Sequence, residues 1–293
     1  MYKLGIDIGG TNVKGIALGE ENDVIFKTKL PTRDTGDEEW KKKVDEVFLL
    51  LKEKVGLPFS LGISAPGLAD PHNTSILHMP GRLKGLTDLD WGNYLGTPCK
   101  VLNDAHAATL AEYHFGVGKG SKHLIMLTLG TGVGGGLIID GQLHQGELGR
   151  AGHLGHIAVR RSDSLDITGT PGSLEDAVGN ASIVARSFGI YTQNEQVFKD
   201  YQEGKTIATY LWLNMVRDLA AALASLVNVF SPEMIILGGG MAQAKEGLLL
   251  PLGNFMDVFE WQPSGHKTPI LLATQGAYAG ALGAAIFSSL KNK

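Results

Sequence analysis

The sequence KLGIDIGGTNVKGIAL at residues 3–18 decides the fold, because two apolar, alternating segments flank a glycine turn. Residues 3–8 and residues 13–18 each have the two-residue period of a β-strand, and Gly9 and Gly10 lie between them. This arrangement predicts a β-hairpin. Residues 24–30 have the composition of a third strand, so the chain is expected to begin with a small antiparallel sheet.

The same plan returns in the middle of the chain. Residues 124–129 predict a strand, GTGVGGG at residues 130–136 a glycine turn, and residues 137–140 a returning strand. A further strand at residues 234–237 leads into three consecutive glycines. The repetition of strand, glycine turn and strand predicts two halves of related topology.

Helical periodicity separates these strands. Trp40, Val44, Val47, Phe48, Leu51 and Val55 share one helical face, with Thr35 and Glu38 as an expected capping box and Gly56 as an expected stop. Further helices are expected at residues 105–115, 207–229 and 277–290, and short strands at residues 61–64 and 99–102. Strands that alternate with helices favour an α/β fold. A domain boundary is expected near residues 115–121.

The composition narrows the class of protein. The chain has 293 residues, 43% of them hydrophobic and 19% charged, which is typical of a globular protein. The net charge of −4 and the lack of a Lys/Arg face argue against nucleic-acid binding. Cys99 is the only cysteine, which fits a reducing compartment. The N-terminus lacks the plan of a signal peptide, and no apolar run approaches a membrane-spanning length, so we expect a cytoplasmic protein without membrane contact.

Glycine is unusually frequent, at 40 of 293 residues, and three glycine clusters directly follow apolar strands. Glycine lets a ligand approach the main chain, so that successive N–H groups can hold phosphate oxygens. Thr11 and Thr131 would add hydroxyl donors. The alternative for each cluster is a simple tight turn. Neither the P-loop pattern nor the GxGxxG spacing is present.

Asp7 stands two residues before the first glycine pair. A carboxylate beside a phosphate-binding turn repels the anion unless a cation intervenes. Asp7 is therefore a candidate for binding Mg²⁺, directly or through water. The alternative is an aspartate that caps the turn.

Several motifs together resemble the ROK family of sugar kinases and sugar-responsive repressors. They are DIGGTN at residues 7–12, LGTGVGGG at 129–136, GQLHQGELGRAGHLGH at 141–156, MIILGGG at 234–240 and GAYAGALGAA at 276–285. The resemblance implies the duplicated actin/hexokinase-like (ribonuclease H-like) fold, with two α/β domains and an ATP/sugar cleft. It implies a small N-terminal domain of residues 1–117, joined by the C-terminal helix at about 277–293, and a larger domain of residues 118–276.

The resemblance also implies the site residues. The residues expected to hold the phosphates of ATP lie in the first two glycine turns and are Gly9, Gly10, Thr11, Asn12, Gly130, Thr131 and Gly132. The residues expected to lie against the adenosine follow the strand at 234–237 and are Gly238, Gly239 and Gly240. The residues expected around the sugar are Gly67, Asn103, Asp104, His153, His156 and Glu175. Asp104 matches the catalytic base, which would accept the proton of the attacking hydroxyl. The alternative for Asn103 and Asp104 is a helix N-cap.

The chain departs from the family pattern at two places. The family's zinc cysteines are replaced by Asp166, Thr168 and Ser173, so no structural zinc is expected and the orientation of His156 must have another source. The usual GExGH motif reads GHLGH, with His153 in place of the glutamate. A neutral imidazole offers one donor and one acceptor, which would suit either a glucose hydroxyl or an N-acetyl group.

These observations predict a homodimeric kinase that transfers phosphate from ATP with Mg²⁺ to the 6-hydroxyl of a glucose-like hexose. One alternative is an N-acetylhexosamine kinase for N-acetylglucosamine or N-acetylmannosamine. A more remote alternative is a non-catalytic sugar-sensing regulator. Such regulators carry a DNA-binding domain before the first glycine turn, which here begins at residue 9.

Overall fold

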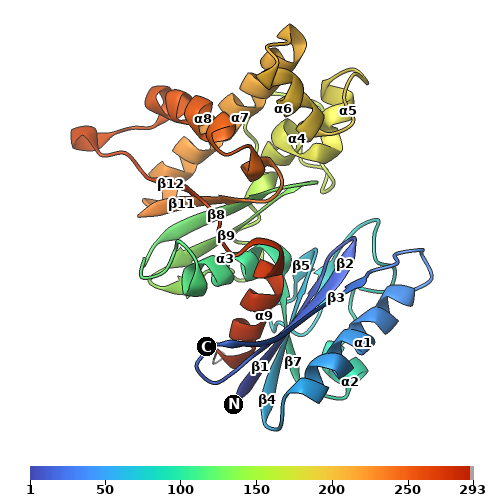
Figure 1. The fold of residues 1–293 in the computed structure, drawn as a ribbon. Coiled ribbons are helices and arrows are strands. Elements are labelled where there is room, and N and C mark those ends of the chain that lie inside the picture. The colour runs from blue at the N-terminus through green and yellow to red at the C-terminus, as the bar shows by residue number, and fades with distance from the viewer. Residues whose placement is uncertain (291–293) are drawn as a thin grey trace. The chain divides into compact units, whose positions relative to one another are not determined.

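The computed structural model describes residues 1–290 and divides into two compact units. Unit 1 contains residues 1–120, 143–151 and the chain from residue 274 onward, whereas unit 2 contains residues 121–142 and 152–273. Residues 291–293, the end of the helix that the sequence assigns to the first domain, lie outside the described residues. Figure 1 shows a separate sheet in each unit.

Unit 1 is built on a five-stranded sheet in the order β3-β2-β1-β4-β7. Its strands are β1 (Tyr2–Ile8), β2 (Asn12–Leu18), β3 (Val24–Pro31), β4 (Phe59–Ala65) and β7 (Cys99–Asn103). The expected hairpin is confirmed, because β1 and β2 pair antiparallel around Gly9 and Gly10. β4 and β7 continue the sheet parallel to β1, so the carboxyl ends of these three strands meet at one edge.

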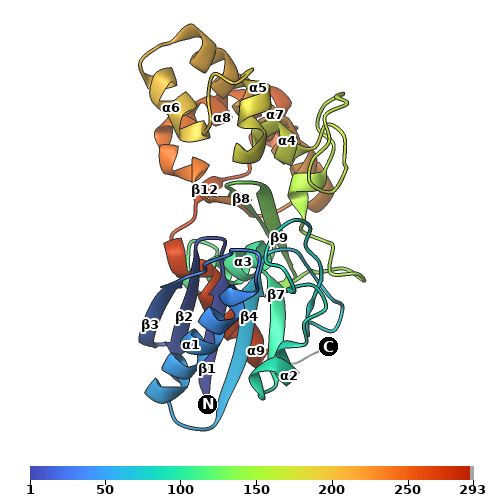
Figure 2. The ribbon, with the colours of Figure 1, turned by 90° about the vertical axis from the view of Figure 1, so that its right-hand side faces the viewer.

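Helices cover both faces of this sheet. α1 (Glu39–Lys54) packs on β2 and β3, whereas α9 (Ala279–Ser289) packs on β1, β4 and α3 (Asp104–Phe115). Figures 1 and 2 show α1 and α9 on opposite sides of the strands. The approach of α9 requires glycine, since a Cβ on Gly5 would lie 1.9 Å from the carbonyl oxygen of Ala281. The last helix thereby closes the core of unit 1.

Smaller elements complete unit 1. They are β5 (Leu68–Ala69), β6 (Ile76–His78) and α2 (Trp91–Leu95). The core between α1 and the sheet includes Trp40 and Trp91, both fully buried, whose rings lie 5.9 Å apart. The indole N–H of Trp40 donates to the carbonyl of Lys84 at 3.1 Å, which ties the loop before α2 to the core.

Unit 2 repeats the topology of unit 1. Its sheet has the order β10-β9-β8-β11-β12, with β8 (Leu124–Leu129), β9 (Val133–Ile139), β10 (Gln142–Leu143), β11 (Met234–Gly238) and β12 (Ile270–Leu272). β8 and β9 form the second antiparallel hairpin, and β11 lies parallel to β8 as β4 lies parallel to β1. The duplication that the sequence predicted is therefore confirmed.

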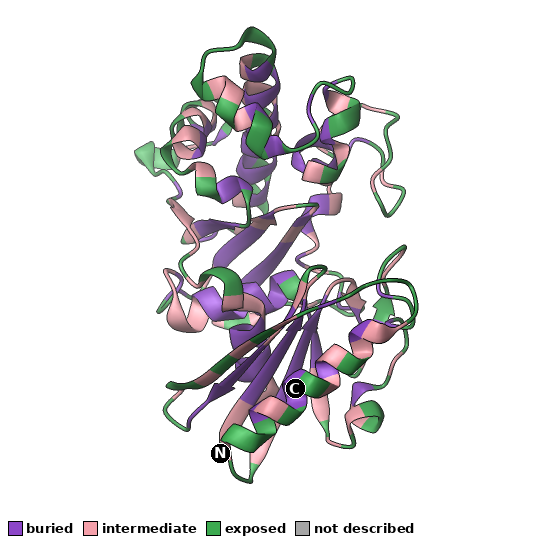
Figure 3. Ribbon diagram, turned by 45° about the vertical axis from the view of Figure 1, so that its right-hand side comes forward, coloured by how far each residue is buried: buried purple, intermediate pink, exposed green. Residues whose placement is uncertain are grey.

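The helices of unit 2 enclose one continuous core with its sheet. They are α4 (Leu174–Val178), α5 (Ile183–Arg186), α6 (Asn194–Gln202), α7 (Thr206–Phe230) and α8 (Glu246–Phe259). Figure 3 shows buried residues along the strands and along one long helix. That helix is α7, and its buried side chains, among them Trp212, Leu219 and Leu223, belong to the core.

α7 corrects one expectation. Of the helices in residues 1–290, it alone meets the length and composition of a membrane span, with 25 residues. Arg217 and Asp218 interrupt its apolar sequence, so that no uninterrupted apolar run of this length stands out in the sequence. Because its apolar face packs into the core of unit 2, α7 is accounted for as the central helix of that core.

Two local predictions were wrong. Thr35 and Glu38 form no capping box, because Glu38 adopts a left-handed conformation with no side-chain cap, and Thr35 donates instead to Asp37 at 2.7 Å. The second glycine turn is shorter than expected, since β9 begins at Val133 and takes in the glycines at 134–136. Antiparallel pairing with β8 outweighs the low strand propensity of glycine at those positions.

Candidate active site

The register of the sheet in unit 1 places polar groups together at its carboxyl edge. Asp7 lies opposite Lys14 on β2 and opposite Ser64 on β4. Asn103 ends β7, and Asp104 begins α3 directly after it. Two strands, β1 and β7, therefore deliver candidate residues to one edge of the sheet, and β4 places Ser64 between them.

Asp7 is buried and held from both neighbouring strands. Ser64 Oγ donates to Asp7 Oδ1 at 2.8 Å, and Lys14 Nζ lies 3.5 Å from Oδ2. Burial raises the pKa of Asp7, although Lys14 and the Ser64 hydroxyl partly offset this effect. A cation beside this carboxylate would offset its desolvation further, so Asp7 fits the Mg²⁺ role that the sequence predicts.

Asn103 and Asp104 form the N-terminus of α3. Asn103 Oδ1 accepts from the N–H groups of Ala105 and His106, at 2.9 and 3.2 Å, so Asn103 caps the helix as the alternative reading had it. Its Nδ2 donates to the carbonyl of Gly67 at 2.8 Å, which joins two predicted substrate residues. The Asn103 side chain also hydrogen-bonds the Asp104 carboxyl, which acts to lower the pKa of Asp104.

Asp104 has the acid-base character of a catalytic group. Its side chain is open to water, and its Oδ1 accepts from the N–H of Ala105 at 2.8 Å. Desolvation by the surrounding protein, together with the negative charge of Asp7, raises the pKa of Asp104 to about 6, whereas the Ala105 N–H and Arg82 act in the opposite direction. A carboxyl group with this pKa is ionised at neutral pH and still basic enough to take a proton.

Two main-chain N–H groups of the first glycine turn are open to a ligand. Gly9 N–H donates to Asn12 O at 3.0 Å, and Thr32 donates to Gly9 O and Thr11 O, which fixes the turn. Within residues 1–290, the exposed N–H groups of Gly10 and Thr11 donate no hydrogen bond. Two adjacent unpaired N–H groups suit an anion such as a phosphate.

The second turn, in unit 2, is built in the same way. Asn180 and Ala181 N–H groups donate to the carbonyls of Gly130 and Thr131, at 3.0 and 2.9 Å. Glu175 Oε2 accepts from the N–H of Val133 at 2.9 Å and lies against Gly132. Among the described residues the N–H groups of Thr131 and Gly132 have no acceptor. The structure thus places Glu175, a predicted sugar residue, against a predicted phosphate turn.

A pocket of about 540 Å³ lies in unit 2 beside this turn. Its lining joins the end of β8 to the residues after β11 and to the first turn of α6: Leu129, Gly130, Thr131, Asn180, Gln193, Asn194, Glu195, Phe198, Trp212, Gly240, Met241, Gln243 and Ala244. Of the three glycines expected against adenosine, Gly240 lines the pocket. Apolar walls with a few amide and hydroxyl groups beside an open anion turn suit a nucleotide.

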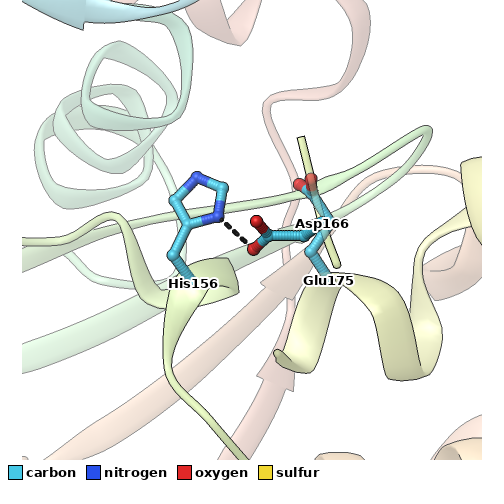
Figure 4. A group of neighbouring side chains, drawn as sticks. All are labelled: His156, Asp166 and Glu175. Atoms are coloured by element: carbon cyan, nitrogen blue, oxygen red, sulfur yellow. Dashed lines mark hydrogen bonds and ion pairs between the residues drawn. The ribbon is translucent and has the colours of Figure 1, made fainter. Parts of the chain in front are cut away.

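The predicted sugar residues of unit 2 lie in a histidine cluster. The rings of His153 and His156 are nearly parallel, 14° apart, with centroids separated by 6.4 Å. Desolvation, with a smaller contribution from His156, lowers the pKa of His153 to about 4, so that its imidazole is neutral in the physiological range. His156 Nδ1 lies 2.8 Å from Asp166 Oδ2. Figure 4 marks this interaction with a dashed line.

The residues at the former zinc positions do not fit zinc. Asp166, His156 and Glu175 bring ligand atoms within 4.8 Å of one another, but they offer two carboxylates and one imidazole, without a thiolate. Hydrogen bonds already occupy this group, because Asp166 Oδ1 accepts from Thr168 N–H, Thr168 Oγ1 and Thr170 N–H at 2.8–2.9 Å. His156 is oriented by Asp166 instead.

Four residues near the predicted groups were missed from the sequence. Lys14 and Ser64 follow from the register opposite Asp7, once the hairpin and the parallel β4 are drawn. Asp166 was read only as a lost cysteine. Arg82, in the loop after β6, gave no local signal, yet its guanidinium lies where a Cβ on Gly10 would be, 1.7 Å from Nη2, and its charge lowers the pKa of Asp104.

Comparisons with known proteins cover most of the chain and indicate one family. The model of the ROK family matches residues 3–290. A glucokinase from Thermotoga maritima is 31% identical over 275 residues, 85% of each chain. An N-acetylmannosamine kinase from Vibrio cholerae is 30% identical over 293 aligned residues, 97% of this chain and 98% of that relative.

Two solved structures have the same fold. A ROK hexokinase from Thermus thermophilus gives a TM-score of 0.86 at 29% identity and covers 98% of each chain. A ROK family glucokinase from Streptomyces griseus, solved in complex with glucose and AMPPNP, gives 0.81 at 27% identity and covers 98% of this chain and 99% of that one. The duplicated architecture is the actin/hexokinase-like fold that the sequence predicted.

Proposed function

Because the chain belongs to the ROK family, we propose that it is an ATP-dependent sugar kinase that phosphorylates a hexose, with Asp104 as the general base. The observation that carries this proposal is the carboxyl edge of unit 1. There Asp104, with a pKa of about 6, stands beside a glycine turn whose N–H groups are open to an anion.

The proposed chemistry uses the carboxylate of Asp104. Its Oδ1 accepts from the Ala105 N–H, and its Oδ2 would take the proton of the sugar hydroxyl while the hydroxyl oxygen bonds to the γ-phosphorus and ADP leaves. Mg²⁺, when bound near Asp7, would neutralise charge on the phosphates. Asn103, whose amide is bonded to Gly67 and lies beside the Asp104 carboxyl, would contact a neighbouring hydroxyl and orient the attacking one.

Nucleotide binding is proposed for the pocket of unit 2 and the glycine turns. The solved relative that binds AMPPNP supports ATP as the donor. The open N–H groups of Thr131 and Gly132 would contact phosphate oxygens, and the pocket between Gly240 and α6 would take the adenosine. Gly238 and Gly239 would support the turn rather than line the pocket, since only Gly240 of the three is in its wall.

For the acceptor, the first candidate is a glucose-like hexose with its 6-hydroxyl as the nucleophile. Several relatives that align with most of this chain are glucokinases, and the solved relative from Streptomyces griseus is in complex with glucose. His153 favours a second candidate, an N-acetylhexosamine. A neutral, partly buried imidazole has an N–H that can donate to an amide carbonyl, which a carboxylate at this position cannot do. The relative from Vibrio cholerae acts on N-acetylmannosamine.

The proposal is tested by ADP release with Mg-ATP over a panel of sugars. The panel contains glucose, mannose, fructose, N-acetylglucosamine and N-acetylmannosamine, with a reaction lacking sugar as control. Turnover that is fastest on glucose supports the first candidate, and a preference for an N-acetyl sugar supports the second. ADP release that does not depend on any sugar would refute the kinase assignment. A cytoplasmic location and a homodimer stay predictions, tested by fractionation and by light scattering.

A further inference from the structure

The cluster around His156 contains a contact that the proposed reaction does not explain. Asp166, in the loop between the histidine segment and α4, presents its carboxylate to the Nδ1 atom of His156 at 2.8 Å (Figure 4). The side chain of Asp166 is only 1% exposed, whereas that of His156 is 26% exposed. A buried carboxylate therefore supports a ring that still reaches open space.

The hydrogen bonds of Asp166 determine which ring nitrogen of His156 carries the proton in the neutral imidazole. Burial opposes ionisation of Asp166, but hydrogen bonds from His156, Thr170, Thr168 and Ser173 outweigh it and lower the pKa of this carboxyl to about 2. An ionised carboxylate only accepts hydrogen bonds, so the bond to His156 requires a proton on Nδ1. In the neutral ring the other nitrogen, Nε2, then carries a lone pair.

We propose that Asp166 is a positioning residue of the sugar site, which holds His156 as the Nδ1–H tautomer and so leaves Nε2 to accept a hydrogen bond from a sugar hydroxyl. A metal ion bound to Nδ1 would have the opposite effect, because it would take that lone pair and leave Nε2 as a donor. This part of the proposal rests on the proposed function, whereas the tautomer of His156 does not.

The neighbours of His156 fit an acceptor at this position. The Glu175 carboxylate lies in the same group of ligand atoms, within 4.8 Å, and also only accepts when ionised. Glu175 would thus offer a sugar a second hydrogen-bond acceptor near this histidine. The donor needed for an amide carbonyl would come from His153, stacked beside His156.

The Asp166→Asn variant makes a defined prediction. Three donors converge on Oδ1, from Thr168 and Thr170, so the amide oxygen takes that place and the amide nitrogen faces His156. Nδ1 must then accept, and the proton moves to Nε2. The sugar hydroxyl loses its acceptor, and the KM for the sugar is expected to rise about tenfold, the effect of one hydrogen bond, while the KM for ATP changes little.

The first measurement is a long-range nitrogen–proton NMR correlation of the histidine rings in the full chain without sugar or nucleotide. Wild-type protein should show His156 protonated at Nδ1, and Asp166→Asn should show it protonated at Nε2. Asp163→Asn is the matched control, since Asp163 is an exposed aspartate of the same loop, and it should leave both the tautomer and the KM unchanged.

Three results would overturn the proposal. They are an Nε2–H tautomer in the wild type, an unchanged tautomer in Asp166→Asn, or one bound metal per chain whose removal by a chelator shifts the His156 resonances. If Asp166→Asn does not fold, the wild-type spectrum and its metal content still decide. A chain that shows the predicted tautomers but phosphorylates no sugar would refute the proposed function and leave the assignment of Asp166 to His156 intact.

Discussion

Replacing Asp104 with asparagine separates the two roles that the structure gives this residue. The amide has nearly the size of the carboxyl group but cannot accept the hydroxyl proton. Removal of a general base typically lowers the rate by about 10²–10⁴-fold, so kcat of Asp104→Asn is expected to fall within that range. The sugar should bind nearly normally, because Asn103 and Gly67 remain in place.

The same substitution should make the protein more stable at neutral pH. The pKa of Asp104 rises from 3.8 to about 6. Roughly two units correspond to ~3 kcal/mol, and screening by water at this exposed side chain reduces the expected gain to about 1 kcal/mol. Because the pKa of Asp104 is higher in the folded state than in the unfolded state, the ionised carboxylate lowers the stability of the folded protein above pH 6. The gain should therefore be present at pH 8 and disappear toward pH 4.

Both effects are measured on one preparation, by ADP release under saturating sugar and by denaturant unfolding at pH 8 and pH 4. Asp23→Asn, an exposed aspartate before β3 in the same unit, is the control and should change neither quantity. If Asp104→Asn keeps more than a tenth of the wild-type kcat, Asp104 is not the base. If it unfolds more easily at pH 8, the carboxylate makes net favourable contacts and its pKa has been assigned the wrong direction.

Four other results are expected. The ratio kcat/KM should fall as the pH drops through about 6, since Asp104 must be unprotonated to act as the base. Arg82→Ala should shift this acidic fall of the pH profile to higher pH, because Arg82 lowers the pKa of Asp104. An unshifted profile would show that Arg82 does not act on Asp104. Ala244→Phe should narrow the unit-2 pocket and raise the KM for ATP at least about tenfold in initial-rate assays, with little change for the sugar. Trp40→Ala should cost about 3–5 kcal/mol in urea unfolding, because the indole is fully buried and bonded to Lys84; a loss below 1 kcal/mol would contradict that packing. Dialysis against EDTA should leave the melting temperature unchanged, and elemental analysis should find far less than one zinc per chain, since Thr168 and Ser173 at the former cysteine positions are already hydrogen-bonded to Asp166.

The sequence predicted the sheet elements well because their signals are local. The alternation around Gly9 and Gly10 and the apolar segment at 124–129 place their strands without tertiary information. Prediction failed where long-range pairing decides. Glycines at 134–136 form a strand only because β8 lies beside them, and the start of α1 depends on the backbone of Glu38, not on a capping side chain.

The candidate site could be named from its motifs, but its partners could not. Lys14 and Ser64 contact Asp7 through strand register, which requires the pairing of β1 with both neighbours. Arg82 reaches Gly10 from a loop with no regular pattern. Asp166 illustrates a different limit. The sequence showed that a metal ligand was missing, but only the folded loop shows that the replacement carboxylate binds the ring of His156.

The central claim is most directly tested by following the phosphorus atom. Phosphorus NMR of a reaction containing Mg-ATP and each sugar of the panel distinguishes transfer from hydrolysis. The account predicts ADP together with a sugar phosphomonoester at the 6-position, formed by the wild type and nearly absent with Asp104→Asn. Inorganic phosphate as the only product, or ATP that stays intact with every sugar, would contradict it.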